Sequence, residues 1–267
     1  MTKKNSIPVR YSGQHFTIDQ ELIKDAIDQA NLTQHDTVLD IGAGKGFFTV
    51  QLLKNANKII AIENDLALIK YLRNRFSNSQ SVQIVGCDFR SFTIPNYPFK
   101  VVSNIPYRIT SEIFKILMFD NIENFLGGSI VLQSEPAKKM ISNRIHNPIT
   151  VFYQTFFDIK LLYEVNPESF LPPPTVKSAL LIIHRKQTSL DYELKGKYLA
   201  FISFFLRKPE MLVNTALKIL FGKNQIRIIS KKFGVNLNAQ IFCLTPNQWK
   251  NCFLEMLKIV PEKFHPS

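Results

Sequence analysis

The sequence contains little cysteine and no long apolar run, and both absences exclude classes of protein. Its three cysteines, Cys87, Cys243 and Cys252, fit no zinc-site spacing, and their odd number argues against a disulfide framework. No stretch approaches the ~18 apolar residues of a membrane span, and the basic start, residues 1–5, lacks the apolar run of a secretory signal. None of the five histidines pairs with another at helical spacing. We therefore expect a cytoplasmic protein that uses no metal and no membrane.

Positive charge is in excess and is unevenly distributed. The net charge is +12, and residues 186–267 contain 13 Lys and Arg against 5 Asp and Glu, a net of +8. Such a surplus favours a polyanionic partner, because cationic side chains that neutralise phosphates release counterions. A solvated basic surface is the alternative that charge alone leaves open.

Short apolar runs alternate with helical patterns through the first two thirds of the chain. Helices are predicted at 22–30, with Asp19 as cap, and at 47–54, 66–76 and 110–119. Strands are predicted at 37–41, 58–62, 82–85, 99–103, 128–133, 158–165 and 178–184. This alternation predicts an α/β, Rossmann-like fold with a mostly parallel seven-stranded sheet.

The later part of the chain has a less regular pattern. Residues 147–157 fit either a helix or a strand, and residues 170–174, Phe-Leu-Pro-Pro-Pro, predict a stiff extended loop without regular structure. Helices are predicted at 198–207, 211–221, 225–233 and 248–259. We therefore divide the chain into an α/β domain, residues 1–186, and a small, basic, all-helical domain, residues 187–267.

A glycine-rich turn follows the first predicted strand of the sheet. Gly42, Gly44 and Gly46 are spaced G-x-G-x-G, which differs from the dinucleotide fingerprint and from the Walker phosphate loop. Glycine lets the backbone approach a ligand, although a tight β–α turn alone would also use it. Glu63 ends the next strand, where an acidic side chain in α/β nucleotide sites binds ribose hydroxyls. Asp65 already lies in the following turn and is the less suitable acid.

Asp88 follows the third of these strands, in Gly86-Cys87-Asp88-Phe89. Its carboxylate could accept a hydrogen bond from an adenine amine, with Phe89 beside the ring, whereas a helix cap or a turn residue is the plainer interpretation. Parallel strands bring their carboxyl ends to one edge, where open α/β sheets bind ligands. The glycine turn, Glu63 and Asp88 together predict an adenosine site without a pyrophosphate, which S-adenosylmethionine fits.

The tetrapeptide Asn104-Ile105-Pro106-Tyr107 follows the fourth strand at the same edge. The exocyclic nitrogen of adenine is a poor nucleophile, and the Asn104 amide oxygen and the Ile105 carbonyl could accept its two N–H groups. Pro106 disfavours a helical Ile105, so that carbonyl can point outward. Tyr107 offers a face on which an extruded base can stack. A strand-end turn with an ordinary aromatic is the alternative.

These motifs, in this order, resemble the Erm family of 23S rRNA adenine-N6 methyltransferases, in particular its Bacteroides-type members. The matching segments are Gly13-Gln14-His15-Phe16, the loop 40–46, Glu63, Asp88-Phe89, the tetrapeptide 104–107, and Phe170-x-Pro-x-Pro-x-Val-x-Ser178. The resemblance implies transfer of one or two methyl groups from S-adenosylmethionine to the N6 amine of one adenine in 23S rRNA. Resistance to macrolides, lincosamides and streptogramin B is the usual consequence.

The resemblance also assigns roles to residues. Cofactor contacts would fall on His15, Thr17, Gly42, Gly44, Glu63, Asp88 and Asn104, and Tyr107 and Phe170 would enclose the target base. Many members have Asn at the position of His15, which makes that contact the less secure one. Arg108, next to Tyr107, is expected to meet a phosphate flanking the target. Residues 1–186 would then form the catalytic domain and 187–267 an RNA-binding domain of a monomeric enzyme.

Two other functions fit part of the pattern. KsgA-type adenine dimethyltransferases of 16S rRNA share the chemistry, but Ile105 is more typical of Erm, since the KsgA-type sequence more often has leucine there. A nucleic-acid-binding factor on an inactive methyltransferase scaffold is the third hypothesis. The presence of Glu63, Asp88 and Asn104 argues against it.

Overall fold

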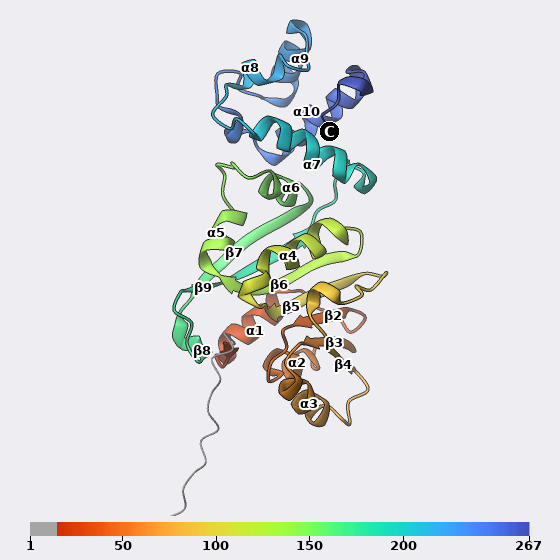
Figure 1. Ribbon diagram of the computed structural model, residues 1–267, viewed down its shortest axis with the longest axis vertical. Coiled ribbons are helices and arrows are strands. Elements are labelled where there is room, and N and C mark those ends of the chain that lie inside the picture. Colours follow the sequence, from red (N-terminus) through yellow and green to blue (C-terminus); the bar gives the residue numbers. More distant parts are fainter. Residues whose placement is uncertain (1–14, 267) are drawn as a thin grey trace, which may run out of the picture.

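A computed structural model of the chain describes residues 15–266 and contains a central seven-stranded sheet (Figure 1). The strand order is β4-β3-β2-β5-β6-β9-β7, and β9 runs antiparallel to the other six strands of this sheet. The strands are β2 (Thr37–Ile41), β3 (Lys58–Glu63), β4 (Val82–Gly86), β5 (Phe99–Asn104), β6 (Phe125–Gln133), β7 (Phe157–Val165) and β9 (Ser178–Arg185). The predicted mostly parallel seven-stranded fold is confirmed.

Helices cover both faces of the sheet, which explains why its strands read as continuous apolar runs. All five residues of β2 are buried, and their side chains alternate between two cores. Val38 packs with α1 (Gln20–Gln29) and α2 (Phe47–Leu52), and Leu39 packs on the opposite side. The N-terminus of α1 is capped by Asp19, as predicted, since its carboxylate accepts from the amides of Glu21 and Leu22.

Four further helices lie between β3 and β7 in the chain. They are α3 (Leu66–Arg75), α4 (Thr110–Lys115), which continues into a π-helical turn (Ile116–Asp120), α5 (Ser134–Met140) and α6 (Pro148–Phe156). Asn147 caps α6 by accepting from the Ile149 amide, with Pro148 in its first turn. The ambiguous segment 147–157 is therefore a helix that runs directly into β7.

All helices after β9 gather at one end of the elongated molecule (Figure 1). They are α7 (Lys195–Leu206), α8 (Val213–Leu217), α9 (Lys223–Phe233) and α10 (Pro246–Ile259), and α8 is shorter than the predicted 211–221. Their core is continuous with that of α6: buried Tyr198 hydrogen-bonds Thr155 at 2.8 Å, and its ring lies 5.2 Å from that of Phe253. The division into two domains at residue 186 stays a prediction.

A second, two-stranded sheet corrects one expectation. β1 (Phe16–Thr17) pairs antiparallel with β8 (Phe170–Leu171), so the first two residues of the segment 170–174 are in regular structure. The prolines begin only at Pro172, and the residues before them are free to pair. This pairing fixes Phe16 and Thr17 beside the glycine turn.

Candidate active site

The carboxyl ends of β2, β3, β4 and β5 surround a cavity of about 350 Å³. That volume lies in the range typical of small-molecule sites. All but two of the predicted site residues line it, from His15 and the glycine turn to the tetrapeptide; the exceptions are Thr17 and Phe170. Four short sequence motifs that are far apart in the chain therefore meet at one edge of the sheet, as predicted.

The glycine turn packs directly on the tetrapeptide. Gly42 has a φ of +75°, and a Cβ added there would lie 3.0 Å from Cγ and Cδ of Pro106. A residue with a side chain would thus be strained in its backbone and crowded against the proline. The absence of a side chain lets these two segments form one continuous wall.

Glu63 is buried and is bound by three backbone amides. Its Oε2 accepts from Gly44 N, and its Oε1 accepts from the amides of Asn64 and Asp65, all at 2.9 Å. A carboxylate has about four lone-pair sites, so one site on Oε2 stays available for a ribose hydroxyl. Asp65 instead caps α3, since its carboxylate accepts from the amides of Ala67 and Leu68. This agrees with the prediction that Asp65 is the less suitable acid for binding a ribose.

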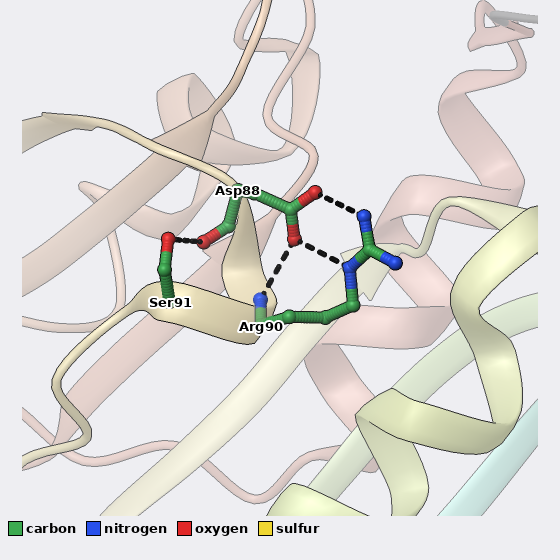
Figure 2. Close-up of polar contacts among 3 residues, drawn as sticks. All are labelled: Asp88, Arg90 and Ser91. Atoms are coloured by element: carbon green, nitrogen blue, oxygen red, sulfur yellow. Dashed lines mark hydrogen bonds and ion pairs between the residues drawn. The ribbon is translucent and has the colours of Figure 1, made fainter.

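Asp88 is held by the side chain and the backbone of Arg90 (Figure 2). Its Oδ1 accepts from Arg90 N at 2.8 Å and from Nε at 3.0 Å, and its Oδ2 accepts from Nη2 at 2.7 Å. These hydrogen bonds from the Arg90 side chain, then from its amide, hold the pKa of Asp88 below its usual value. Sequence reasoning found Asp88 but missed Arg90, whose only signal was its position two residues after the acid.

Asn104 ends β5 with one half of its side-chain amide bonded and the other half without a partner. Nδ2 donates to the carbonyl oxygen of His15 at 2.8 Å, whereas the buried Oδ1 has no hydrogen bond. A buried acceptor without a donor costs about 1–3 kcal/mol. The buried Oγ1 of Thr17 also has no hydrogen-bond partner. Thr17 lines a smaller cavity together with Asn104, Gly44 and Asp40.

The remaining tetrapeptide residues shape the wall of the cavity. Ile105 is buried, and its amide donates to the carbonyl of Val131 at 3.1 Å. Pro106, with φ −61° and ψ 116°, begins a short 3-10 helix (Tyr107–Ile109). Both Ile105 and Pro106 line the cavity.

Tyr107 is oriented by a hydrogen bond between its hydroxyl group and Ser178 Oγ, 2.7 Å away. Burial raises the pKa of this phenol, so it stays protonated at neutral pH. Its ring is stacked with the imidazole of His15, with the centroids 6.1 Å apart, and Nδ1 of His15 lies 2.8 Å from the Pro172 carbonyl oxygen. Arg108, beside it, is exposed at the cavity.

Phe170 does not lie where sequence reasoning placed it. Its ring is 1% exposed and belongs to the core between α1 and the sheet, with Leu22, Ile23 and Leu180. The residue lies in β8, where alternate side chains face opposite sides, and Leu171 is the one that points outward at 55% exposure. In this conformation Phe170 cannot cover a base at the cavity, and His15 is the aromatic partner of Tyr107.

One buried acid next to the site was not predicted. Asp40, in the strand before the glycine turn, accepts from Thr49 Oγ1 at 2.6 Å, and burial raises its pKa to about 7. The nearby charge of Glu63 acts in the same direction.

Neither a metal cluster nor a membrane-crossing helix is found among residues 15–266. No three His, Cys, Asp or Glu side chains in that range gather closely enough to bind a metal ion. None of the helices there has the length and apolarity that a membrane crossing requires.

Comparisons with known proteins point to one group of enzymes. The model of the family "Ribosomal RNA adenine dimethylase" matches residues 6–258. An rRNA adenine N-6-methyltransferase of Bacteroides fragilis is 68% identical over all 267 residues of both chains. A probable ribosomal RNA small subunit methyltransferase A of Methanococcoides burtonii is 33% identical over 210 residues, 77% of this chain and 76% of that one. The crystal structure of the 23S rRNA methyltransferase ErmE superposes with a TM-score of 0.79 at 25% identity, over 90% of this chain and 99% of that one.

Proposed function

The chain belongs to the ribosomal RNA adenine dimethylase family and is an rRNA adenine N6-methyltransferase, and we propose that it acts on one adenine of 23S rRNA. It transfers one or two methyl groups from S-adenosylmethionine and thereby confers resistance to macrolides, lincosamides and streptogramin B. The observation that carries this proposal is the buried, unpaired Oδ1 of Asn104, a residue that lines the same cavity as Tyr107.

The residues around the cavity fit S-adenosylmethionine. Glu63 retains one acceptor site for the ribose, Asp88 offers a charged acceptor to the adenine amine, and the glycine turn leaves room for the nucleoside. The unpaired hydroxyl of Thr17, which shares a smaller cavity with Asn104, lies where a polar group of the methionine end would satisfy it. His15 would contact the same end. When bound, the cofactor supplies a methyl group already activated on a sulfonium.

The tetrapeptide prepares the adenine amine for attack. Asn104 Oδ1 and the Ile105 carbonyl accept the two N–H groups and stabilise the charge that develops on nitrogen. Pro106 holds that backbone, and the Tyr107 ring, fixed through Ser178, stacks on the extruded base. Because positioning supplies most of the catalysis, these residues need no strong base among them.

The choice of 23S over 16S rRNA is supported by the likeness to ErmE over nearly the whole of both chains. Ile105 and the higher identity to the Bacteroides enzyme than to the small-subunit enzyme point the same way. Residues 187–267, with their excess positive charge, are proposed to bind the RNA, and Arg108 to meet a phosphate beside the target. The enzyme is proposed to act as a monomer in the cytoplasm, without a metal.

Primer extension on rRNA from cells that express the protein tests this function. We expect one strong stop at an adenine of 23S rRNA, no new stop in 16S rRNA, and raised tolerance of erythromycin. Neither change is expected with Tyr107→Ala. A stop in 16S rRNA would favour the KsgA-type alternative. Calorimetry with the cofactor tests the inactive-scaffold alternative, since a pure binding factor would release no heat.

A further inference from the structure

Arg90 lies at the edge of the cavity and takes no part in the chemistry described above. It follows β4 in a short 3-10 helix (Phe89–Ser91) that Asp88 caps, and both Asp88 and Arg90 line the cavity. Figure 2 shows the guanidinium folded back on the carboxylate of Asp88 instead of extending into solvent. Ser91 anchors the same turn, since its Oγ donates to the Asp88 carbonyl oxygen at 2.9 Å.

Arg90 determines which acceptor site of Asp88 stays available. Three of the roughly four lone-pair sites of the carboxylate are used: two on Oδ1, by Arg90 N and Nε, and one on Oδ2, by Nη2. The fork of guanidinium and carboxylate also fixes the plane of the carboxylate, which a single hydrogen bond would not do. One acceptor site, on Oδ2, therefore remains, and its direction is set by Arg90.

From this geometry we propose that Arg90 is a positioning residue that makes the site select a cofactor base with an amino group at position 6. The inference deepens the proposed function and rests on it. An ionised, oriented Asp88 accepts from a 6-amino group but repels a 6-oxo group, which presents lone pairs to the carboxylate. Without the fork, Asp88 can rotate away, so the attraction and the repulsion both weaken.

The guanidinium is suited to this task where other cations are not. It is planar and permanently charged and bonds both carboxylate oxygens at once, whereas a lysine ammonium would bind as a point charge. The side chain of Arg90 is 54% exposed, so replacing it should not disturb the core. Loss of Arg90 therefore tests orientation of Asp88 more than stability of the fold.

Calorimetry with two cofactor products that differ at one position tests the proposal. The probes are S-adenosylhomocysteine and its 6-oxo analogue, S-inosylhomocysteine. We expect the wild type to prefer the adenine form by on the order of 100-fold, as for a hydrogen bond to a charged group. Arg90→Met should reduce that ratio to about 10-fold or less, and Arg90→Lys should not restore it. Arg73→Met, which removes an exposed arginine from α3, is the matched control and should keep the wild-type ratio.

A double-mutant cycle shows whether Arg90 acts through Asp88. In Asp88→Ala, the further change Arg90→Met should alter neither dissociation constant. The proposal is overturned if Arg90→Met keeps the wild-type ratio of the two affinities, or if Arg90→Lys restores that ratio. It is also overturned if Arg90→Met changes the affinities equally in the presence and in the absence of Asp88. If the wild type binds neither probe, the proposed function fails as well, whereas binding of S-adenosylhomocysteine with an Arg90-independent ratio refutes this inference alone.

Discussion

Replacing Asn104 with alanine should separate activity from stability to an unusual degree. The substitution removes the hydrogen bond from Nδ2 to the His15 carbonyl oxygen, which contributes about 1 kcal/mol. It also removes the buried, unpaired Oδ1, whose burial costs about 1–3 kcal/mol. The two effects oppose each other, so the free energy of unfolding should stay unchanged or rise by up to about 2 kcal/mol. Each kcal/mol of such a rise corresponds to an increase in Tm of ~2–4 °C for a chain of about this size.

The effect on methyl transfer should be far larger. If Asn104 Oδ1 accepts an N–H of the target amine, its loss resembles the removal of one preorganised group from a transition-state site, which costs about 100- to 1,000-fold in rate. Transfer of labelled methyl groups to rRNA at saturating cofactor, measured beside thermal unfolding, gives both quantities on one preparation.

Ser103→Ala is the matched control on the same strand. Ser103 is fully buried, and its Oγ lacks a partner as Asn104 Oδ1 does, but Ser103 does not line the cavity. Its replacement should leave methylation unchanged and stability equal or slightly higher. An Asn104→Ala variant that unfolds several kcal/mol more easily, or that methylates rRNA at the wild-type rate, would contradict this role of Asn104.

Three further substitutions test other parts of the site. Tyr107→Phe keeps the ring but loses the hydrogen bond to Ser178, so it should keep most of the methylation activity and lose about 1 kcal/mol of the free energy of unfolding. Tyr107→Ala should bind the cofactor normally but should not methylate rRNA. Asp40 has a native pKa of about 7 against 3.8 for the free group, so the native state keeps a proton that the unfolded chain has released. The free energy of unfolding should thus fall by at most ~4 kcal/mol as pH rises from about 4 to about 7. Urea unfolding at pH 5 and pH 8 should show a smaller change with pH for Asp40→Asn than for the wild type. Phe170→Ala should lower the free energy of unfolding by about 3–5 kcal/mol, while Phe170→Leu should stay folded and active. A folded but inactive leucine variant would show that the ring leaves the core to cover the base.

The sequence predicts the position of the site because position depends on topology. Gly42, Glu63 and Asn104 each lie at the carboxyl end of a strand, and parallel strands bring their carboxyl ends together. An alternating pattern of strands and helices therefore fixes which residues share that edge, before any side-chain orientation is known. The helix predicted at 211–221 is present but shorter, because the apolar periodicity continues past the end of α8.

Side-chain orientation depends on tertiary contacts that a local pattern does not contain. Phe170 was predicted at the cavity because it precedes a rigid proline segment, but the pairing of β8 with β1 turns its ring into the core. Arg90 was missed for a related reason: a fork to a carboxylate two residues earlier requires a particular turn and rotamer.

The distribution of hydrogen bonds divides the site into two parts with different tasks. Glu63 and Asp88 each use three of about four acceptor sites within the protein, so they are rigid before any ligand arrives and are suited to recognising a nucleoside. Thr17 Oγ1 and Asn104 Oδ1 have no partner, and the free energy spent on burying them is returned only when a ligand donates or accepts a hydrogen bond there. Recognition is thus prepared at the ends of β3 and β4, whereas the unsatisfied polar groups lie in β1 and at the end of β5, where we propose that the reacting atoms meet.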